Sequence, residues 1–178
     1  MTDPGVSKSA DIEHGTEHGT FDEWPAPLRA LFNGESIETK TDFTASLLAT
    51  VDGRVRTSLL SVGELFAPDE RSVCFSLWPE SRTALAIGRT GRAALSFVFD
   101  EAFFQVQLMV RVAPSIKGSP VTCFMASIEA GEWQKVGYAR LTHGIEFEFA
   151  REQEAAVLER WRDQVDVLKR TAAQDADA

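Results

Sequence analysis

The sequence has few of the features that mark disulfide-rich, membrane-spanning or polyanion-binding proteins. It contains only two cysteines, Cys74 and Cys123, both in apolar runs, so we expect free buried thiols and no disulfide framework. No run approaches the roughly 18 apolar residues that cross a bilayer, and the N-terminus has no apolar stretch typical of a secretory signal. The formal net charge of −9 argues against nucleic acids and anionic lipids as partners, since both would repel such a surface. We therefore expect a cytoplasmic protein.

Sequence motifs of several enzyme classes are also absent. There is no Gly-x-Gly-x-x-Gly after a strand, no phosphate-loop Gly-Lys-Ser/Thr and no Gly-x-Ser-x-Gly elbow. His143 has no matched nucleophile or metal partner, so we expect a loop or strand-end residue and assign no catalytic side chain. His14 and His18 stand four residues apart, but nearby glycines disfavour a helix and no thiolate or third histidine lies close, so we predict no metal site. Such a chain can obtain its chemistry from an organic cofactor.

The hydrophobic pattern predicts one mainly β domain with flanking helices. Residues 1–20 read as a disordered N-terminal segment, 21–170 as the folded domain and 171–178 as a frayed tail. Short turns such as Asp52-Gly53 join the strand-like runs, which is typical of antiparallel pairing and favours a barrel of six or seven strands. The predicted strands span 43–51, 54–62, 73–78, 93–99, 104–112, 121–130 and 145–149. The predicted helices span 25–34, 82–90 (internal) and 151–170 (C-terminal).

Two segments have the side chains that a phosphate group requires. The first is the strand around Arg56, where Ser58 points the same way as the arginine and adds a hydroxyl donor. The second is Ser81-Arg82-Thr83 at the start of the internal helix, where free backbone amides and the helix dipole favour an anion. The alternatives are that Arg56 is a solvated strand residue and that Ser81 only caps the helix.

The charge is unevenly distributed along the chain. Residues 52–92 carry six basic and five acidic side chains, whereas the segments before and after them hold the acidic surplus. Both candidate phosphate segments lie in this one positive stretch. The acidic total therefore excludes a polyanion as partner without excluding a single phosphate group.

The stretch from Asp52 to Arg111 resembles the flavin-binding split-barrel family related to pyridoxamine 5′-phosphate oxidase. The resemblance lies in the runs DGRVRTSLLSVG, FSLWPESRTALAI and FFQVQLMVR, in that order and spacing. It implies a split barrel that forms a homodimer and binds flavin mononucleotide (FMN) at the subunit interface. The residues it implies for the phosphate and the ring edge are Arg56, Thr57, Ser58, Leu59, Leu60, Ser61, Ser81, Arg82 and Thr83. It places Ser76, Leu77 and Trp78 near the ring, and Gln105 or Gln107 as a contact reaching from the second subunit.

Two departures from the family pattern bear on the activity. Ser61 and Thr83 stand where the true oxidases usually carry basic residues, which argues against oxidation of a pyridoxine phosphate. We therefore expect an FMN-dependent oxidoreductase acting on another small molecule, or a non-catalytic protein that holds a flavin, deazaflavin or haem on the same fold. A third hypothesis is a dimeric interaction module whose C-terminal helix docks a partner through an exposed apolar stripe. The stripe consists of Val157, Trp161, Val165 and Leu168, and its packing on the barrel is the alternative.

Overall fold

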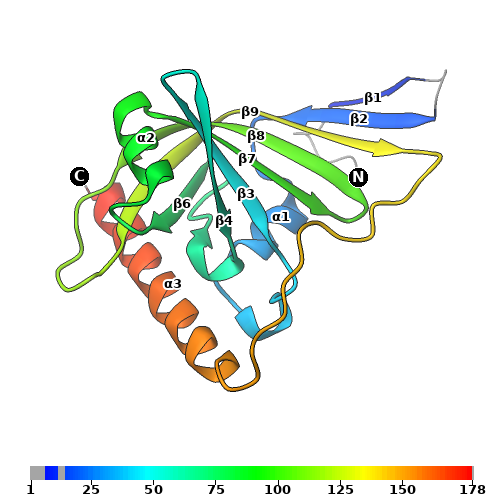
Figure 1. The fold of residues 1–178 in the computed structure, drawn as a ribbon. Helices are drawn as coiled ribbons and strands as arrows, with labels where there is room; N and C mark the ends of the chain where they lie inside the picture. Colours follow the sequence, from blue (N-terminus) through cyan, green and yellow to red (C-terminus); the bar gives the residue numbers. More distant parts are fainter. Residues whose placement is uncertain (1–6, 12–14, 178) are drawn as a thin grey trace.

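A strongly curled antiparallel sheet forms the centre of the molecule, and helices cover its open sides (Figure 1). The structure is a computed structural model that describes residues 7–11 and 15–177. The strands are β1 (Ser7–Asp11), β2 (Thr16–Phe21), β3 (Ala45–Val51), β4 (Arg54–Leu60), β5 (Leu65–Phe66), β6 (Ser72–Leu77), β7 (Arg92–Phe99), β8 (Ala102–Val112) and β9 (Thr122–Val136). The helices are α1 (Ala26–Leu31), α2 (Arg82–Thr90) and α3 (Glu154–Ala176), with short 3-10 turns η1 (Ile37–Thr39) and η2 (Val62–Glu64).

The sheet follows the order β1-β2-β9-β8-β7-β3-β4, and every recorded pairing is antiparallel. Strand β9 is long enough to pair with β6 near its start and with β2 near its end, while β8 lies along its other edge. Within the described residues, β4 pairs only with β3 and is therefore an edge strand. The expected mainly β architecture, with an internal and a C-terminal helix, is confirmed.

The turn between β3 and β4 forms as the sequence predicts. Asp52 and Gly53 both have positive φ, +51° and +69°, which two-residue hairpin turns of this kind require and which the Asp-Gly pair tolerates. The turn sets the register, so that Leu47 faces Ser58 and Ala49 faces Arg56. Because the register is fixed, Arg56 and Ser58 lie on the same face of β4.

Helix α2 begins and ends at the predicted residues. The Ser81 hydroxyl accepts a hydrogen bond from the Ala84 amide at 3.1 Å, and Gly91 ends the helix in the left-handed conformation. The helix buries Ala84, Ala86 and Ile87 and packs against β3 and β4. Its N-terminus is thereby held beside the edge strand.

Aromatic side chains fill the core between the sheet and the first helix. Phe97 and Phe104 stack with ring centroids 5.2 Å apart, and Phe32 meets Phe43 and Phe97 edge-on at 5.5 and 5.8 Å. Aromatic pairs of this geometry add about 0.5–1.5 kcal/mol each beyond the area that they bury. The cluster keeps the curled sheet rigid behind β3 and β4.

The C-terminal helix packs on the barrel and leaves no free apolar stripe. Trp161, Val165 and Leu168 are all buried, and α3 lies against η2, β5 and β6. The hypothesis of an exposed docking stripe is therefore wrong. Cys74 and Cys123 are free and buried, as predicted. None of the described helices combines the length and apolar character that crossing a membrane requires.

Several boundaries differ from the sequence predictions. Thr16–Phe21 forms β2 inside the segment predicted to be disordered, because it pairs with the end of β9, far away in the sequence. This pairing also extends β9 beyond residue 130 and, with β1 and β5, raises the strand count to nine. Helix α3 continues to Ala176, where a frayed tail was predicted, because Thr171 and Ala172 are buried. His14 lies outside the described residues.

The predicted strand over 145–149 is wrong. The segment between β9 and α3 has no regular structure, and Ile145 remains about half exposed. Phe147 and Phe149 instead meet the Trp161 ring of α3 edge-on, with centroids 6.2 and 5.5 Å away. The alternation of apolar residues thus reflects contacts with a helix and no strand pairing.

Candidate functional site

The two segments predicted to hold a phosphate lie directly beside each other. The Ser58 hydroxyl on β4 donates a hydrogen bond to the Thr83 hydroxyl on α2 at 2.9 Å. Arg56 lies on the same strand face as Ser58, and Arg82 precedes Thr83 at the start of the helix. We call Arg56, Ser58, Arg82 and Thr83 the β4–α2 junction. Residues 25 positions apart in the sequence are thus brought into a single group of donors.

The first turn of α2 supplies backbone donors to this junction. The Ser81 amide donates a hydrogen bond to the Trp78 carbonyl at 3.0 Å, and the Ser81 hydroxyl accepts one from the Ala84 amide. The amides of Arg82 and Thr83 are left as first-turn donors, since a helix offers them no internal partner. Ser81 is therefore a capping residue, and its cap does not use the next two amides; its predicted phosphate contact stays a prediction.

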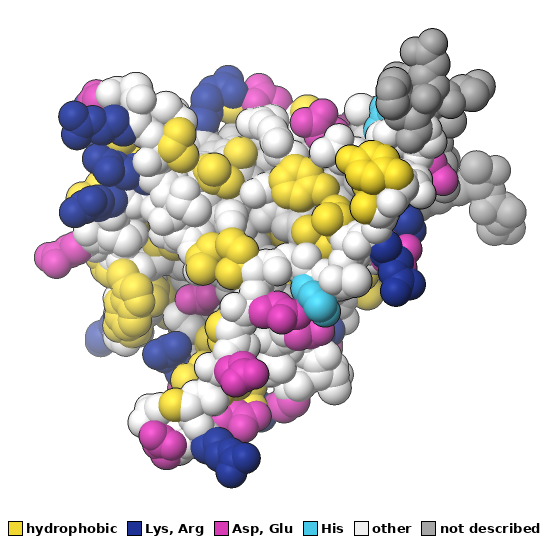
Figure 2. All heavy atoms as spheres, turned by 45° about the vertical axis from the view of Figure 1, so that its right-hand side comes forward, with side chains coloured by type: hydrophobic (Ala, Val, Ile, Leu, Met, Phe, Trp, Pro, Cys, Tyr) yellow, Lys and Arg dark blue, Asp and Glu magenta, His cyan; other side chains and the backbone are white. Residues whose placement is uncertain are grey.

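The arginines of the junction, like Arg54 on the same strand, have no ion pair among the described residues. Arg89 pairs with Asp52 at 2.9 Å and Arg92 with Glu129 at 2.8 Å, whereas Arg56 and Arg82 have no acidic partner within 4.0 Å. In Figure 2 a group of Lys and Arg side chains lies at the upper left, on the side where Figure 1 shows α2. This part of an acidic protein is therefore suited to an anion.

The exposed side of β4 is partly apolar. Val55 is 58% and Leu59 51% exposed, and Thr57 between them is also exposed, while Leu60 is buried. A single chain has little reason to keep two large apolar side chains in water on an edge strand.

Ser61 lies next to this strand but does not belong to the junction. Its amide and hydroxyl both bond the Glu64 carboxylate, at 2.8 and 3.0 Å, and its hydroxyl accepts the Gly63 amide. This is a capping box that forms η2. Burial is the main cause of the raised pKa of Glu64, and the bonds from Ser61 oppose the rise.

The residues at the end of β6 divide between core and surface. Ser76 and Leu77 are buried, and the Ser76 hydroxyl has no partner among the described residues. Trp78 is 55% exposed and directly precedes the turn into α2. The structure thus leaves Trp78 as the side chain of this group that a planar ligand can contact.

Gln105 and Gln107 lie on β8, away from the β4–α2 junction of the same chain. Both are half-buried on the polar face of the strand, as the alternation predicts. Gln105 lines a cavity of about 270 Å³ together with His18, Phe103 and Trp133. The predicted contact of Gln105 or Gln107 with a flavin bound to the second subunit stays a prediction.

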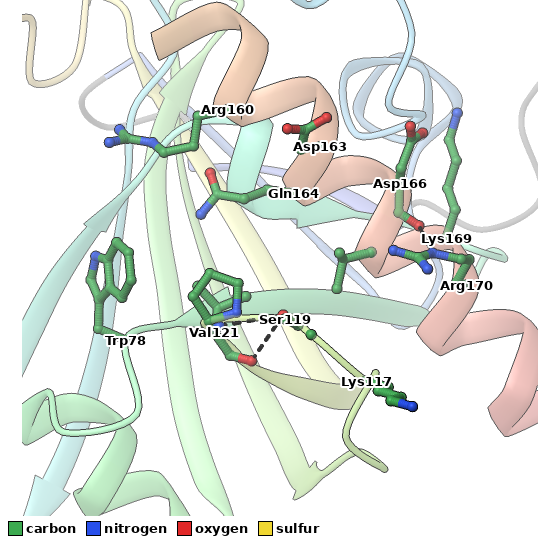
Figure 3. A pocket seen from close by; sticks show the side chains of 13 residues that line it. Trp78, Lys117, Ser119, Val121, Arg160, Asp163, Gln164, Asp166, Lys169 and Arg170 are labelled. Carbon is green, nitrogen blue, oxygen red and sulfur yellow. Dashed lines mark hydrogen bonds between the residues drawn. The ribbon is translucent and has the colours of Figure 1, made fainter. Parts of the chain in front are cut away.

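A larger cavity, which the sequence analysis did not identify, lies between α3 and the loop before β9 (Figure 3). Trp78 stands at its edge, and Arg160 and Gln164 line it from α3. One signal was available in the sequence: Gln164 interrupts the apolar stripe of the helix, between Trp161 and Leu168. A polar residue within the apolar stripe of a helix is buried together with that stripe when the helix packs.

The comparisons with known proteins describe what the chain is similar to. No family model matches it. It is 28% identical over 150 residues to the uncharacterised protein YclD of Bacillus subtilis, covering 80% of this chain and 94% of that protein. A structure of a putative pyridoxamine 5′-phosphate oxidase from Lactobacillus delbrueckii matches at 13% identity and a TM-score of 0.48, covering 62% of this chain and 93% of the other. The styrene monooxygenase flavin reductase of Pseudomonas putida matches at 15% identity and a TM-score of 0.40, covering 61% and 93%.

Proposed function

We propose that this chain binds FMN at the β4–α2 junction and is a flavin-dependent oxidoreductase acting on a small molecule. The observation that carries the proposal is the hydrogen bond between Ser58 and Thr83, because it joins the two candidate phosphate segments into one group. Arg56 lies on the same strand face as Ser58, and Arg82 lies in the first turn of α2; both are without acidic partners among the described residues. Charge-assisted donors of this kind are what a phosphate monoester requires.

The residues around the junction fit the rest of the cofactor as well. Arg56 and Arg82 would bind the phosphate, with Ser58 or Thr83 turning a hydroxyl toward it. The unpaired edge of β4, with the backbone groups of Leu59 and Leu60, would lie along the ring, and Trp78 would contact its edge or face. The flavin, when bound, supplies the exchange of hydride or electrons. The chain supplies binding, orientation and exclusion of water.

A second copy of the chain completes the proposed site. Val55 and Leu59 expose apolar surface beside the junction, and burying a large apolar side chain is worth about 1.5–3 kcal/mol. In a homodimer, this surface would be covered, and Gln105 or Gln107 of the second copy would reach the ring. Sedimentation or light scattering measures the mass directly, and a monomer at micromolar concentration would refute the dimer.

A specific observation favours a second candidate, a non-catalytic binder of a flavin, deazaflavin or haem. The β4–α2 junction consists of two arginines and two hydroxyls and includes no histidine, carboxylate or thiol of the kind that usually acts as a general acid or base. Reduction of the bound cofactor by a nicotinamide nucleotide, followed by its reoxidation over many cycles, distinguishes an oxidoreductase from a carrier.

Titration with FMN tests the binding proposal. We expect the purified chain to show flavin absorbance or to quench added FMN fluorescence. Arg82→Ala should weaken binding about tenfold or more, because a charge-assisted hydrogen bond is worth about 1.5–3 kcal/mol when desolvated. Arg92→Ala is the matched control, since Arg92 pairs with Glu129. No binding, or equal losses in the two variants, would refute the proposal.

A further inference from the structure

The cavity beside α3 has the size of a small-molecule site. Its volume is about 730 Å³, within the range of roughly 300–1,000 Å³ that ligand pockets occupy. Helix α3 forms one wall, and residues 117–121 of the loop before β9 form the other. Trp78 is the residue that it shares with the proposed flavin site, and the four residues of the β4–α2 junction do not line it.

A buried polar side chain without a partner lines this cavity. Gln164 is only 9% exposed, and its Oε1 atom has no hydrogen-bond partner among the described residues. A buried amide left unpaired costs about 1–3 kcal/mol. In Figure 3 the Gln164 amide points away from α3, with its nitrogen on the side of Trp78 and Val121 and its oxygen on the side of Arg160. A ligand with a polar group at this point would satisfy the amide.

The charge of the cavity is positive although the protein is acidic. Four of its lining residues are basic and two are acidic. Lys117 and Arg160 have no ion pair among the described residues. In Figure 3 the carboxylates of Asp163 and Asp166 point away from Trp78, whereas Arg160 extends to the same side as the Gln164 amide.

The other two cations of the cavity, Lys169 and Arg170, have partners. Lys169 pairs with Glu35 at 3.0 Å, and Arg170 donates to the Asp166 carbonyl at 3.4 Å. Glu64 attracts Arg160 at longer range, but its carboxylate is already bonded to Ser61. Arg160 is therefore the cation best placed to meet a ligand anion beside the tryptophan.

The shape of the ligand follows from the apolar groups. The half-exposed Trp78 ring stands on one side, and Pro120 and Val121 lie on the other. A flat ring between them would gain aromatic contact on one face and apolar contact on the other. A planar guanidinium such as that of Arg160 suits a carboxylate or phosphate group at the edge of this ring.

We propose that this cavity binds a small molecule that has a flat ring and one anionic group, a carboxylate or a phosphate. Arg160 binds the anion, Gln164 hydrogen-bonds a polar group, and Trp78 stacks on the ring. The ligand site stands on these residues alone. Its further role, as the place where the substrate lies next to the flavin across Trp78, rests on the proposed function.

Calorimetric titration of the full chain with phenyl phosphate, benzoate and uncharged benzyl alcohol tests the site. We expect at least one of the two anions to bind about tenfold more tightly than the alcohol, and the stronger of them identifies the anionic group. Arg160→Gln should weaken that binding about tenfold, and Gln164→Leu should weaken it severalfold. Arg151→Gln is the matched control, because this exposed arginine lies outside the cavity and should leave the affinity within twofold.

The outcomes separate this proposal from the proposed function. Anion binding that is no stronger than alcohol binding, or equal losses in Arg160→Gln and Arg151→Gln, would overturn the ligand site. FMN titration of the same variants gives the independent result, since Arg160→Gln should bind FMN like the unaltered chain. If Arg160-dependent anion binding is found in a chain that binds no FMN, the ligand site stands and the flavin proposal fails.

Discussion

Replacing Gly63 by alanine should loosen the attachment of α3 to the barrel. An added Cβ at Gly63 would lie 2.3 Å from Cγ and 2.4 Å from Cβ of Trp161. Ordinary carbon contacts are about 3.5–4.0 Å, so the overlap is more than about 1 Å at both atoms. Trp161 has little room to move, because it is buried and its ring meets Phe147 and Phe149. The φ of Gly63 is not positive, so the effect is steric alone.

The expected loss is about 2–3 kcal/mol of unfolding free energy. Overpacking costs about 1–3 kcal/mol, and this overlap belongs at the upper end. The smaller entropy of an unfolded chain with alanine offsets about 0.4–1 kcal/mol of it. For a chain of this length, each kcal/mol lowers Tm by about 2–4 °C, so the decrease should be about 4–12 °C.

Thermal unfolding followed by circular dichroism measures the change, and Gly88→Ala is the matched control. Gly88 lies within α2, and an added Cβ there would meet no atom within 4 Å. That variant should gain about 0.5–1 kcal/mol, because alanine favours a helix interior. A Gly63→Ala protein with an unchanged or higher Tm would refute the close contact with Trp161.

Two further predictions concern buried ionisable groups. Burial raises the pKa of Glu64 above its unfolded value, so the stability that this group adds is complete below about pH 4.5 and is lost as the pH rises through the folded pKa. Glu64→Gln keeps an acceptor for Ser61 and should therefore gain unfolding free energy relative to the unaltered chain as pH rises; a constant difference in denaturant titrations at several pH values contradicts this. Burial also raises the pKa of the Cys74 and Cys123 thiols, so Ellman's reagent should label neither in the folded protein and both in denaturant. Rapid labelling of the folded chain would contradict their burial.

Local chemistry allowed much of the fold to be predicted from the sequence. The Asp52-Gly53 turn and the boundaries of α2 from Ser81 to Gly91 depend on conformational preferences of a few adjacent residues, and all formed as expected. The capping box of Ser61 and Glu64 was equally visible, as a serine followed three residues later by a glutamate. The predicted contact of Ser61 with the flavin stays a prediction.

The remaining features depend on contacts between distant segments. Thr16–Phe21 carries no strong strand pattern, and it is a strand because β9 continues far enough to pair with it. Apolar and polar residues alternate from Ile145 to Phe149, and this pattern is the same whether the apolar side chains pack on a sheet or on a helix. The cavity beside α3 combines Trp78, the loop before β9 and Arg160, which no local pattern connects.

The irregular connection over residues 137–153 has a consequence for how this protein can change in evolution. It separates α3 from the strands along the chain. The helix is therefore held in place by side-chain packing, because within the described residues it shares no backbone hydrogen bonds with the sheet. Substitutions on the face of α3 that carries Arg160 and Gln164 can therefore accumulate without altering the register of β3 and β4. A lineage could acquire a new ligand preference on this helix while its β4–α2 junction stays the same.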